Sequence, residues 1–167
     1  MIKTITVIII SMKFTDYEVV LSEIPDEITL AINISNCPYH CEGCHSPHLW
    51  KDIGTVISPW ELMNLIEKNK GITCVAFMGG PFNEVIIASS FIHYVYPKLK
   101  TAWYTGSSAL PIEWHDLDYI KIGRYIKEQG PLNNPKTNQR LYKIDRLAYP
   151  GFKGMENITP KLWKNIK

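Results

Sequence analysis

Apolar residues follow two periods along the chain, one typical of strands and one typical of helices. The run at residues 73–78 is continuously apolar, as expected of a strand buried in a parallel sheet. By contrast, Leu62, Leu65 and Ile66 recur at helical spacing. The pattern predicts strands over residues 4–11, 18–21, 29–35, 73–78, 100–104, 119–122 and 141–144. It also predicts a helix that begins after Ser58, a second helix over residues 83–95, and a short C-terminal helix over residues 161–167.

The helix that begins at Ser58 has the best-marked start. Serine is a favoured N-cap, and Pro59 suits the first helical position. Glu61 follows the cap by three residues, as in a capping box. Gly71 is expected to end this helix.

Strand, loop and helix alternate through the middle of the chain, which predicts an α/β fold with a largely parallel sheet. Several of the predicted strands end at glycine, so their ends are expected to face one side. A small, incomplete (β/α) barrel fits this order. With 167 residues, the chain is expected to form a single domain over residues 1–167.

Composition excludes several classes of protein. The chain is 46% hydrophobic and 20% charged, which is ordinary for a globular protein. A formal net charge of +2 gives no sign of a nucleic-acid-binding surface, and no apolar run is long enough to span a bilayer. Residues 1–11 are short, β-branched and without a small-residue cleavage site, so they predict a strand rather than a signal peptide. A reducing cytosol is therefore expected.

Three of the four cysteines form a compact motif directly after the strand at residues 29–35. Cys37, Cys41 and Cys44 have the spacing C-x3-C-x2-C. A cubane iron–sulfur cluster normally takes four thiolates, so three would leave one iron open for chemistry. The position after a strand also fits, because ligand sites collect at the carboxyl ends of parallel strands. Cys74 lies in an apolar strand and is expected to be an inert buried thiol.

A structural zinc site is the main alternative for these cysteines. Zinc accepts three cysteines and one histidine, and His40, His45 and His48 are all close in sequence. Zinc sites more usually carry a second ligand pair at a distance, which is missing here. The spacing therefore favours the iron–sulfur cluster.

The cysteine motif resembles that of the radical S-adenosylmethionine (SAM) enzymes. In that superfamily the motif holds a [4Fe–4S] cluster whose open iron binds SAM, and the fold is a partial barrel. The resemblance implies that Gly79 and Gly80 contact the amino group of SAM. The superfamily has an acidic residue after the two glycines, whereas this chain has Pro81. Either Glu84 substitutes for it, or the backbone carbonyls suffice.

Other stretches resemble the activating enzymes of the anaerobic (class III) ribonucleotide reductase, and the resemblance covers roughly residues 17–145. Gly43 stands where many radical SAM proteins have an aromatic residue, which members of this family often lack as well. The stretches that carry the resemblance are residues 45–50 (HSPHLW), 103–106 (WYTG), 118–125 (DYIKIGRY) and 137–141 (TNQRL).

This resemblance implies an enzyme that makes a glycyl radical on the large subunit of the reductase, with an electron from a flavodoxin-like donor. No nucleic acid or membrane partner is expected. Thr105 and Lys121, at strand ends, are candidates for contacts to the ribose or carboxylate of SAM. Arg140 either docks the reductase or braces the fold. Core packing is the expected role of Trp50 and Trp103.

Two other functions remain open from the sequence. A small-molecule radical SAM enzyme, similar to 7-carboxy-7-deazaguanine synthase, would turn over without a protein partner. A zinc-stabilised binding module would have no catalysis at all. The first would contain a cluster, and the second would be colourless with one zinc per chain.

Overall fold

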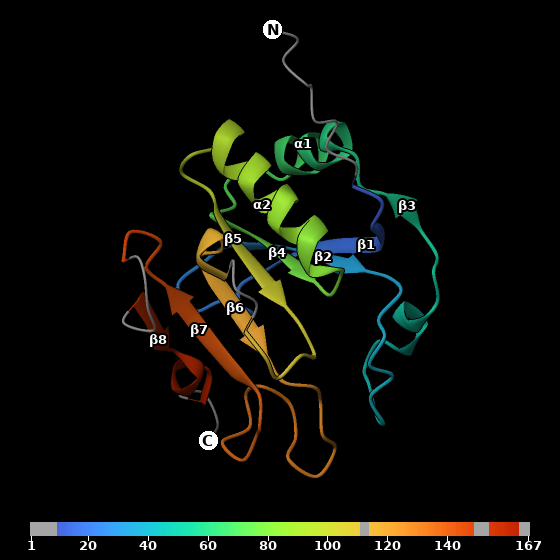
Figure 1. Ribbon diagram of the computed structural model, residues 1–167, viewed down its shortest axis with the longest axis vertical. Coiled ribbons are helices and arrows are strands. Elements are labelled where there is room, and N and C mark those ends of the chain that lie inside the picture. Colours follow the sequence, from blue (N-terminus) through green and yellow to red (C-terminus); the bar gives the residue numbers. More distant parts are fainter. Residues whose placement is uncertain (1–9, 111–113, 149–153, 164–167) are drawn as a thin grey trace, which may run out of the picture.

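The computed structural model describes residues 10–110, 114–148 and 154–163 (Figure 1). Nearly all of the strand predicted over residues 4–11 lies outside this part, and the described Ile10 and Ser11 are not in a strand. The short helix predicted over residues 161–167 is described only in part. The 3₁₀ helix Thr159–Trp163 covers its beginning, and the rest lies outside the described residues.

One sheet of eight strands forms the frame, in the order β3-β1-β2-β4-β5-β6-β7-β8 (Figure 1). The strands β2, β4, β5 and β6 are parallel, and the pairs that flank them are antiparallel. The strands are β1 (Lys13–Val20), β2 (Thr29–Ile34), β3 (Thr55–Val56), β4 (Cys74–Met78), β5 (Lys100–Tyr104), β6 (Tyr119–Ile122), β7 (Arg140–Ile144) and β8 (Met155–Asn157), and the α-helices are α1 (Pro59–Lys68) and α2 (Phe82–Val95).

The prediction of an α/β fold is confirmed, but the sheet is mixed, with a parallel centre between antiparallel flanks. The reason lies in the connections. Between β1 and β2, and between β6 and β7, the described chain contains no α-helix. Antiparallel neighbours can be joined by a simple turn or loop, whereas a parallel pair needs a long crossover. The crossovers are α1, between β2 and β4, α2, between β4 and β5, and the segment that contains the 3₁₀ helix Trp114–Asp116, between β5 and β6.

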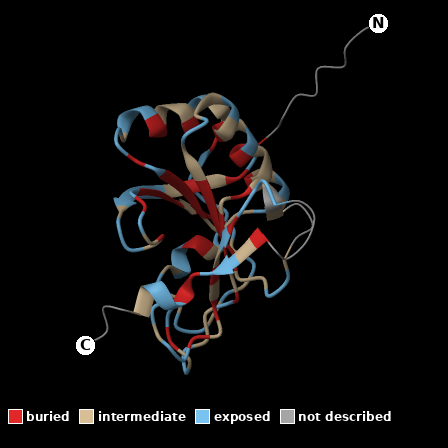
Figure 2. Ribbon diagram, turned by 90° about the vertical axis from the view of Figure 1, so that its left-hand side faces the viewer, coloured by how far each residue is buried: buried red, intermediate tan, exposed pale blue. Residues whose placement is uncertain are grey.

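Both α-helices of the described chain cover the same face of the sheet. Leu62 and Leu65 of α1 and Val85 of α2 share one core cluster with Leu30 and Phe77 of the sheet. The parallel strands advance in one direction along the sheet, and right-handed crossovers then place successive helices on one side. Figure 2 shows the buried residues concentrated in these central strands.

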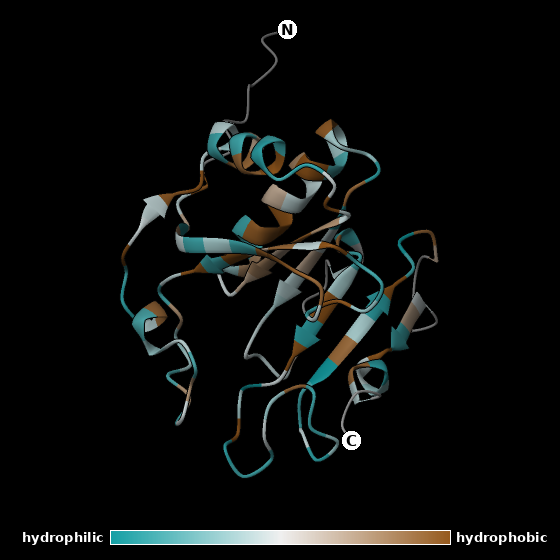
Figure 3. Ribbon diagram, turned by 180° about the vertical axis from the view of Figure 1, so that it is seen from behind, coloured by the Kyte–Doolittle hydropathy of each residue, from teal (hydrophilic) through white to brown (hydrophobic). Residues whose placement is uncertain are grey.

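The other face of the sheet has a smaller core without an α-helix. Ala76 of β4 and Ala102 of β5 belong to this core. Ile24, between β1 and β2, and Ile158, directly after β8, pack in the same cluster. The loop between β6 and β7 is largely hydrophilic (Figure 3) and extends past the carboxyl ends of the parallel strands. No helix in the described part of the chain combines the length and apolar character needed to cross a bilayer.

The start of α1 agrees with its predicted cap. Ser58 Oγ accepts a hydrogen bond of 3.0 Å from the backbone N–H of Glu61. The helix ends at Lys68, three residues before Gly71. Asn69 causes the earlier end, because its side-chain amide donates to the carbonyl of Leu65 at 2.7 Å and satisfies a group that the helix leaves open.

A buried carboxylate at the amino ends of the parallel strands links four segments. Glu27 is 5% exposed and accepts hydrogen bonds from Thr73 Oγ1 at 2.6 Å, from Tyr119 Oη at 2.7 Å and from Lys100 Nζ. Burial alone would raise the pKa of Glu27, but these hydrogen bonds outweigh it and the pKa is lowered. The carboxylate is therefore charged in the folded protein at neutral pH.

Glu27→Gln is expected to lower the free energy of unfolding by about 2 kcal/mol at neutral pH, because buried donors lose a charged acceptor. For a domain of this size that is a fall in Tm of about 4–8 °C. Because the folded pKa is lowered, this stabilisation is present above the ordinary value of 4.5 and is lost as pH falls through the lowered pKa. Thermal melts from pH 7 to pH 3 check this, with the exposed Glu128→Gln as control. A Tm difference that does not shrink in acid would contradict it.

Candidate functional site

A cavity of about 1070 Å³ opens at the carboxyl ends of the parallel strands. It lies where loops leave β2, β4, β5 and β6. All seven residues that the sequence predicts to bind the cluster or SAM line its walls: Cys37, Cys41, Cys44, Gly79, Gly80, Thr105 and Lys121. Binding sites of α/β proteins occupy this edge of the sheet because side chains and backbone from several strands converge there.

The cysteine loop, residues 37–44, follows β2 and turns along one wall of the cavity. Cys37 N–H donates to the carbonyl of Leu49 at 2.9 Å, and Cys44 N–H donates to that of Cys41 at 3.1 Å. Gly43 has φ +73°, which favours glycine at this turn. All three loop cysteines are free, half-buried thiols. Among the described residues no group of three or more Cys, His, Asp or Glu is arranged for a metal, so binding a cluster would require the loop to draw its sulfurs together.

Cys74, by contrast, is fully buried in β4 and lies outside the cavity lining. Burial raises the pKa of its thiol well above the ordinary value. A neutral, inaccessible thiol is a poor nucleophile and a poor metal ligand.

Tyr39 holds the cysteine loop against the ends of β5 and β6. Its ring lies on Gly106, where a Cβ atom would come within 2.6 Å of Tyr39 Cδ2. Arg124 reaches the loop from beyond β6, with Nη2 donating to the carbonyl of Tyr39 at 2.6 Å and the guanidinium 5.8 Å from the ring centroid. The sequence analysis missed this contact, because Arg124 is 85 residues from Tyr39 and no local pattern marks it.

The three histidines near the cysteines each contact another group. His40 stacks on Trp50 with ring centroids 4.9 Å apart, and His45 meets the Tyr125 ring at 5.9 Å. His48 Nε2 lies 3.9 Å from a carboxylate oxygen of Asp16. These positions give no particular support to a histidine as a fourth zinc ligand.

The Gly79–Gly80 turn follows β4 and adopts a conformation that suits only glycine. The φ angles are +107° and +91°. A Cβ atom on Gly80 would also lie 3.2 Å from the Ile34 side chain. Trp103 lies in the core as predicted, and its indole N–H donates to the carbonyl of Gly79 at 2.9 Å. The turn therefore presents backbone without side chains to the cavity, and the carbonyl of Gly79 already accepts one hydrogen bond.

The carboxylate of Glu84, the candidate substitute for the acidic residue after the glycines, is already engaged within the protein. Its carboxylate accepts hydrogen bonds from Ser11 Oγ at 2.7 Å and from the backbone N–H groups of Ser11 and Met12, both at 2.5 Å. These bonds tie the segment before β1 to the first turn of α2. The backbone of the turn remains the better candidate for contacting an amino group.

Lys121 lies on β6 at the wall of the cavity and is 9% exposed. Its Nζ donates to the carbonyls of Thr105 at 3.1 Å and Gly123 at 3.0 Å, and to Gln139 Oε1 at 3.0 Å. Burial lowers its pKa to about 8, although the charges of Cys41, Cys37 and Glu23 oppose this shift. All three donors of the ammonium are used, so a SAM carboxylate could bind it only by displacing one of these acceptors.

Thr105 and Arg140 both make internal contacts. Thr105 Oγ1 accepts from the backbone N–H of Ser107 at 3.1 Å. Arg140 Nη1 donates to the carbonyls of Thr137 at 2.6 Å and Gln139 at 2.7 Å. Of the two roles considered for Arg140, these contacts are those of a residue that braces the loop entering β7.

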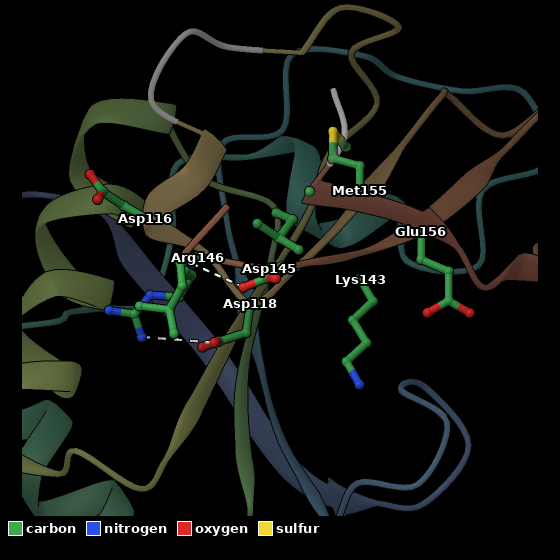
Figure 4. A pocket seen from close by; sticks show the side chains of 10 residues that line it. Asp116, Asp118, Lys143, Asp145, Arg146, Met155 and Glu156 are labelled. Atoms are coloured by element: carbon green, nitrogen blue, oxygen red, sulfur yellow. Dashed lines mark hydrogen bonds and ion pairs between the residues drawn. The ribbon is translucent and has the colours of Figure 1, made fainter. Parts of the chain in front are cut away.

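A second cavity of about 780 Å³ lies at the opposite edge of the sheet, between the start of β6 and the end of β7 (Figure 4). Asp118 lies in its wall, with Oδ2 2.9 Å from His93 Nε2 and Oδ1 3.8 Å from Arg146 Nη1. None of the residues predicted from the sequence to bind the cluster or SAM lines this cavity.

No family model, curated protein or solved structure matches this chain.

Proposed function

We propose that this protein is a radical SAM activase that generates a glycyl radical on an anaerobic ribonucleotide reductase. The convergence of Cys37, Cys41, Cys44 and the Gly79–Gly80 turn on one cavity is the observation that carries the proposal. When bound, a [4Fe–4S] cluster would supply one electron that splits SAM into methionine and a 5′-deoxyadenosyl radical, which takes a hydrogen atom from a glycine of the large reductase subunit.

The chain's own residues would bind, orient and shield these groups. The thiolates of the three loop cysteines would hold three irons and leave the fourth open. The turn at Gly79 and Gly80 lets a ligand approach the backbone, since no side chain intervenes. Leu49 and Trp103 line the cavity and are largely buried, so they would help to exclude water from a reactive radical. A flavodoxin-like donor is proposed to supply the electron.

The arrangement of helices supports the incomplete (β/α) barrel that this function implies. In a barrel of this type the helices lie outside, and the inward-facing side chains of the strands fill the interior. Both described α-helices lie on one face, and strand residues such as Ala76, Ala102 and Tyr104 lie on the other. We propose that the parallel strands β2, β4, β5 and β6 form the barrel wall and that the cavity is its open top.

The exposed rim of the cavity fits a protein substrate. The exposed Arg124 and the half-buried Tyr125 are among its lining residues, so a partner surface can reach them. A loop of a partner protein would fill the remaining space and close the cavity.

The test is anaerobic reconstitution with iron and sulfide, followed by assay with SAM and a reductant. We expect about four irons per chain, release of 5′-deoxyadenosine, and a glycyl radical signal in electron paramagnetic resonance (EPR) when the large reductase subunit of the same organism is added. Colourless protein that holds zinc would support the binding module instead. A cluster that turns over a small molecule without a protein partner would support the synthase-like enzyme.

A further inference from the structure

One buried cation stands in the wall of the cysteine cavity. Lys121 is the single lysine or arginine that is buried among the described residues. Cys37 and Cys41 line the same cavity. Lys121 Nζ binds the carbonyl of Thr105, and the next residue, Gly106, lies against the Tyr39 ring of the cysteine loop. Other basic residues around the cavity, such as Lys13 and Arg124, are much more exposed. Water and salt screen those charges far more than the charge of Lys121.

The ammonium of Lys121 is fixed in place and yet not neutralised. Its three acceptors, the carbonyls of Thr105 and Gly123 and the amide of Gln139, are all uncharged. Its Nζ also lies 5.7 Å from the centroid of the Tyr104 ring, which gives a weak favourable contact. Lys121 makes no ion pair within the described residues, and Glu23 acts on it only at longer range. The hydrogen bonds therefore satisfy its donors and leave its positive charge free to act on the cavity.

We propose that Lys121 raises the reduction potential of the cluster by its charge, rather than by binding SAM; this rests on the proposed function. The step affected is the transfer of one electron from an external reductant to the cluster, which takes it from the 2+ to the 1+ state. No bond forms or breaks, and no proton moves. The added electron makes the cluster more negative, so a nearby positive charge in a water-poor site stabilises the reduced form.

The experiment is a redox titration of the reconstituted protein without SAM. Dithionite and mediator dyes set the potential, and EPR measures the fraction of reduced cluster at each point. Lys121→Met removes the charge and keeps most of the side-chain volume. We expect its equilibrium constant for reduction to fall at least tenfold, which for one electron is about 59 mV toward more negative potential. Lys121→Gln, also uncharged, should show the same shift, and Lys121→Arg should stay near the wild-type potential.

Lys127→Met is the matched control. Lys127 lies against the cysteine loop, with its Cδ atom 3.6 Å from where a Cβ of Gly43 would be, but its side chain is 62% exposed. Its charge is therefore screened, and its removal is expected to leave the potential nearly unchanged. A shift equal to that of Lys121→Met would mean that any lysine near the loop has this effect, and would overturn a special role for Lys121.

The other outcomes also decide between roles. An unchanged potential in Lys121→Met, with weaker SAM binding, would make Lys121 a ligand for SAM and overturn the inference. If both uncharged variants fail to bind iron while Lys121→Arg does, Lys121 acts in assembly of the site, and the inference is again wrong. A wild-type protein that forms no cluster would instead refute the proposed function, which separates the two failures.

Discussion

Cys41→Ser is expected to abolish both iron loading and the cleavage of SAM. The three loop cysteines would be the whole protein ligand set of the cluster, and a serine hydroxyl does not replace a thiolate for iron at neutral pH. Iron and sulfide content, the absorption spectrum and 5′-deoxyadenosine release measure the effect. All should fall to the level of protein without added iron, and Cys37→Ser and Cys44→Ser should behave in the same way.

Cys74→Ala is the matched control for this prediction. Cys74 is the remaining cysteine, fully buried in β4 and outside the cavity lining. Its replacement removes one buried sulfur, so it should cost about 1 kcal/mol of stability and leave the cluster intact. Full iron loading in Cys41→Ser, or its loss in Cys74→Ala, would show that the ligand set is wrong.

Gly106→Ala is expected to reduce iron loading about tenfold or more, although Gly106 would touch neither iron nor SAM. A Cβ atom at this position would lie 2.6 Å from Tyr39 Cδ2 and 2.7 Å from Cγ, which is far inside contact distance. The ring must move, and Tyr39 lies between Cys37 and Cys41 in the loop. Changes to groups that position metal ligands typically cost 10- to 100-fold in affinity.

A double-mutant cycle separates this cause from a general loss of stability. In Tyr39→Ala/Gly106→Ala the clash is gone, so iron loading should recover to the level of Tyr39→Ala alone. Isothermal iron titrations and thermal melts of the four proteins give both quantities. If Gly106→Ala binds iron like the wild type, the ring adapts without moving the loop, and the proposed support of the loop is wrong.

The centre of the fold could be predicted from the sequence because its patterns are local. The apolar run at residues 73–78 becomes β4 (Cys74–Met78), and the helix predicted over residues 83–95 becomes α2 (Phe82–Val95). The flanks were harder. β1 begins at Lys13, five residues before the predicted start, because both faces of its middle are exposed and no apolar alternation marks it. The short β3 and β8 were missed for the same reason.

The candidate site divides in a similar way. The cysteines and the paired glycines could be found because each motif consists of residues close together in the sequence. Two other residues could not be found from the sequence. Arg124 binds the carbonyl of Tyr39, and Glu27 joins strands at the amino ends of the parallel strands. Their partners lie 85 and up to 92 residues away, so only the folded sheet brings them together. The same holds for Lys121, whose saturated hydrogen bonds were not foreseeable from its position at a strand end.

The long separation between Tyr39 and Arg124 has a consequence for the order of events during translation. At about 5–20 residues per second, the 85 residues between them take about 4–17 s to synthesise. For most of that interval the three loop thiols are already made, but Arg124, which binds the loop, is not. Iron delivered to the nascent chain in that interval would meet an unsupported loop, so insertion of the proposed cluster is expected only after Arg124 has been synthesised.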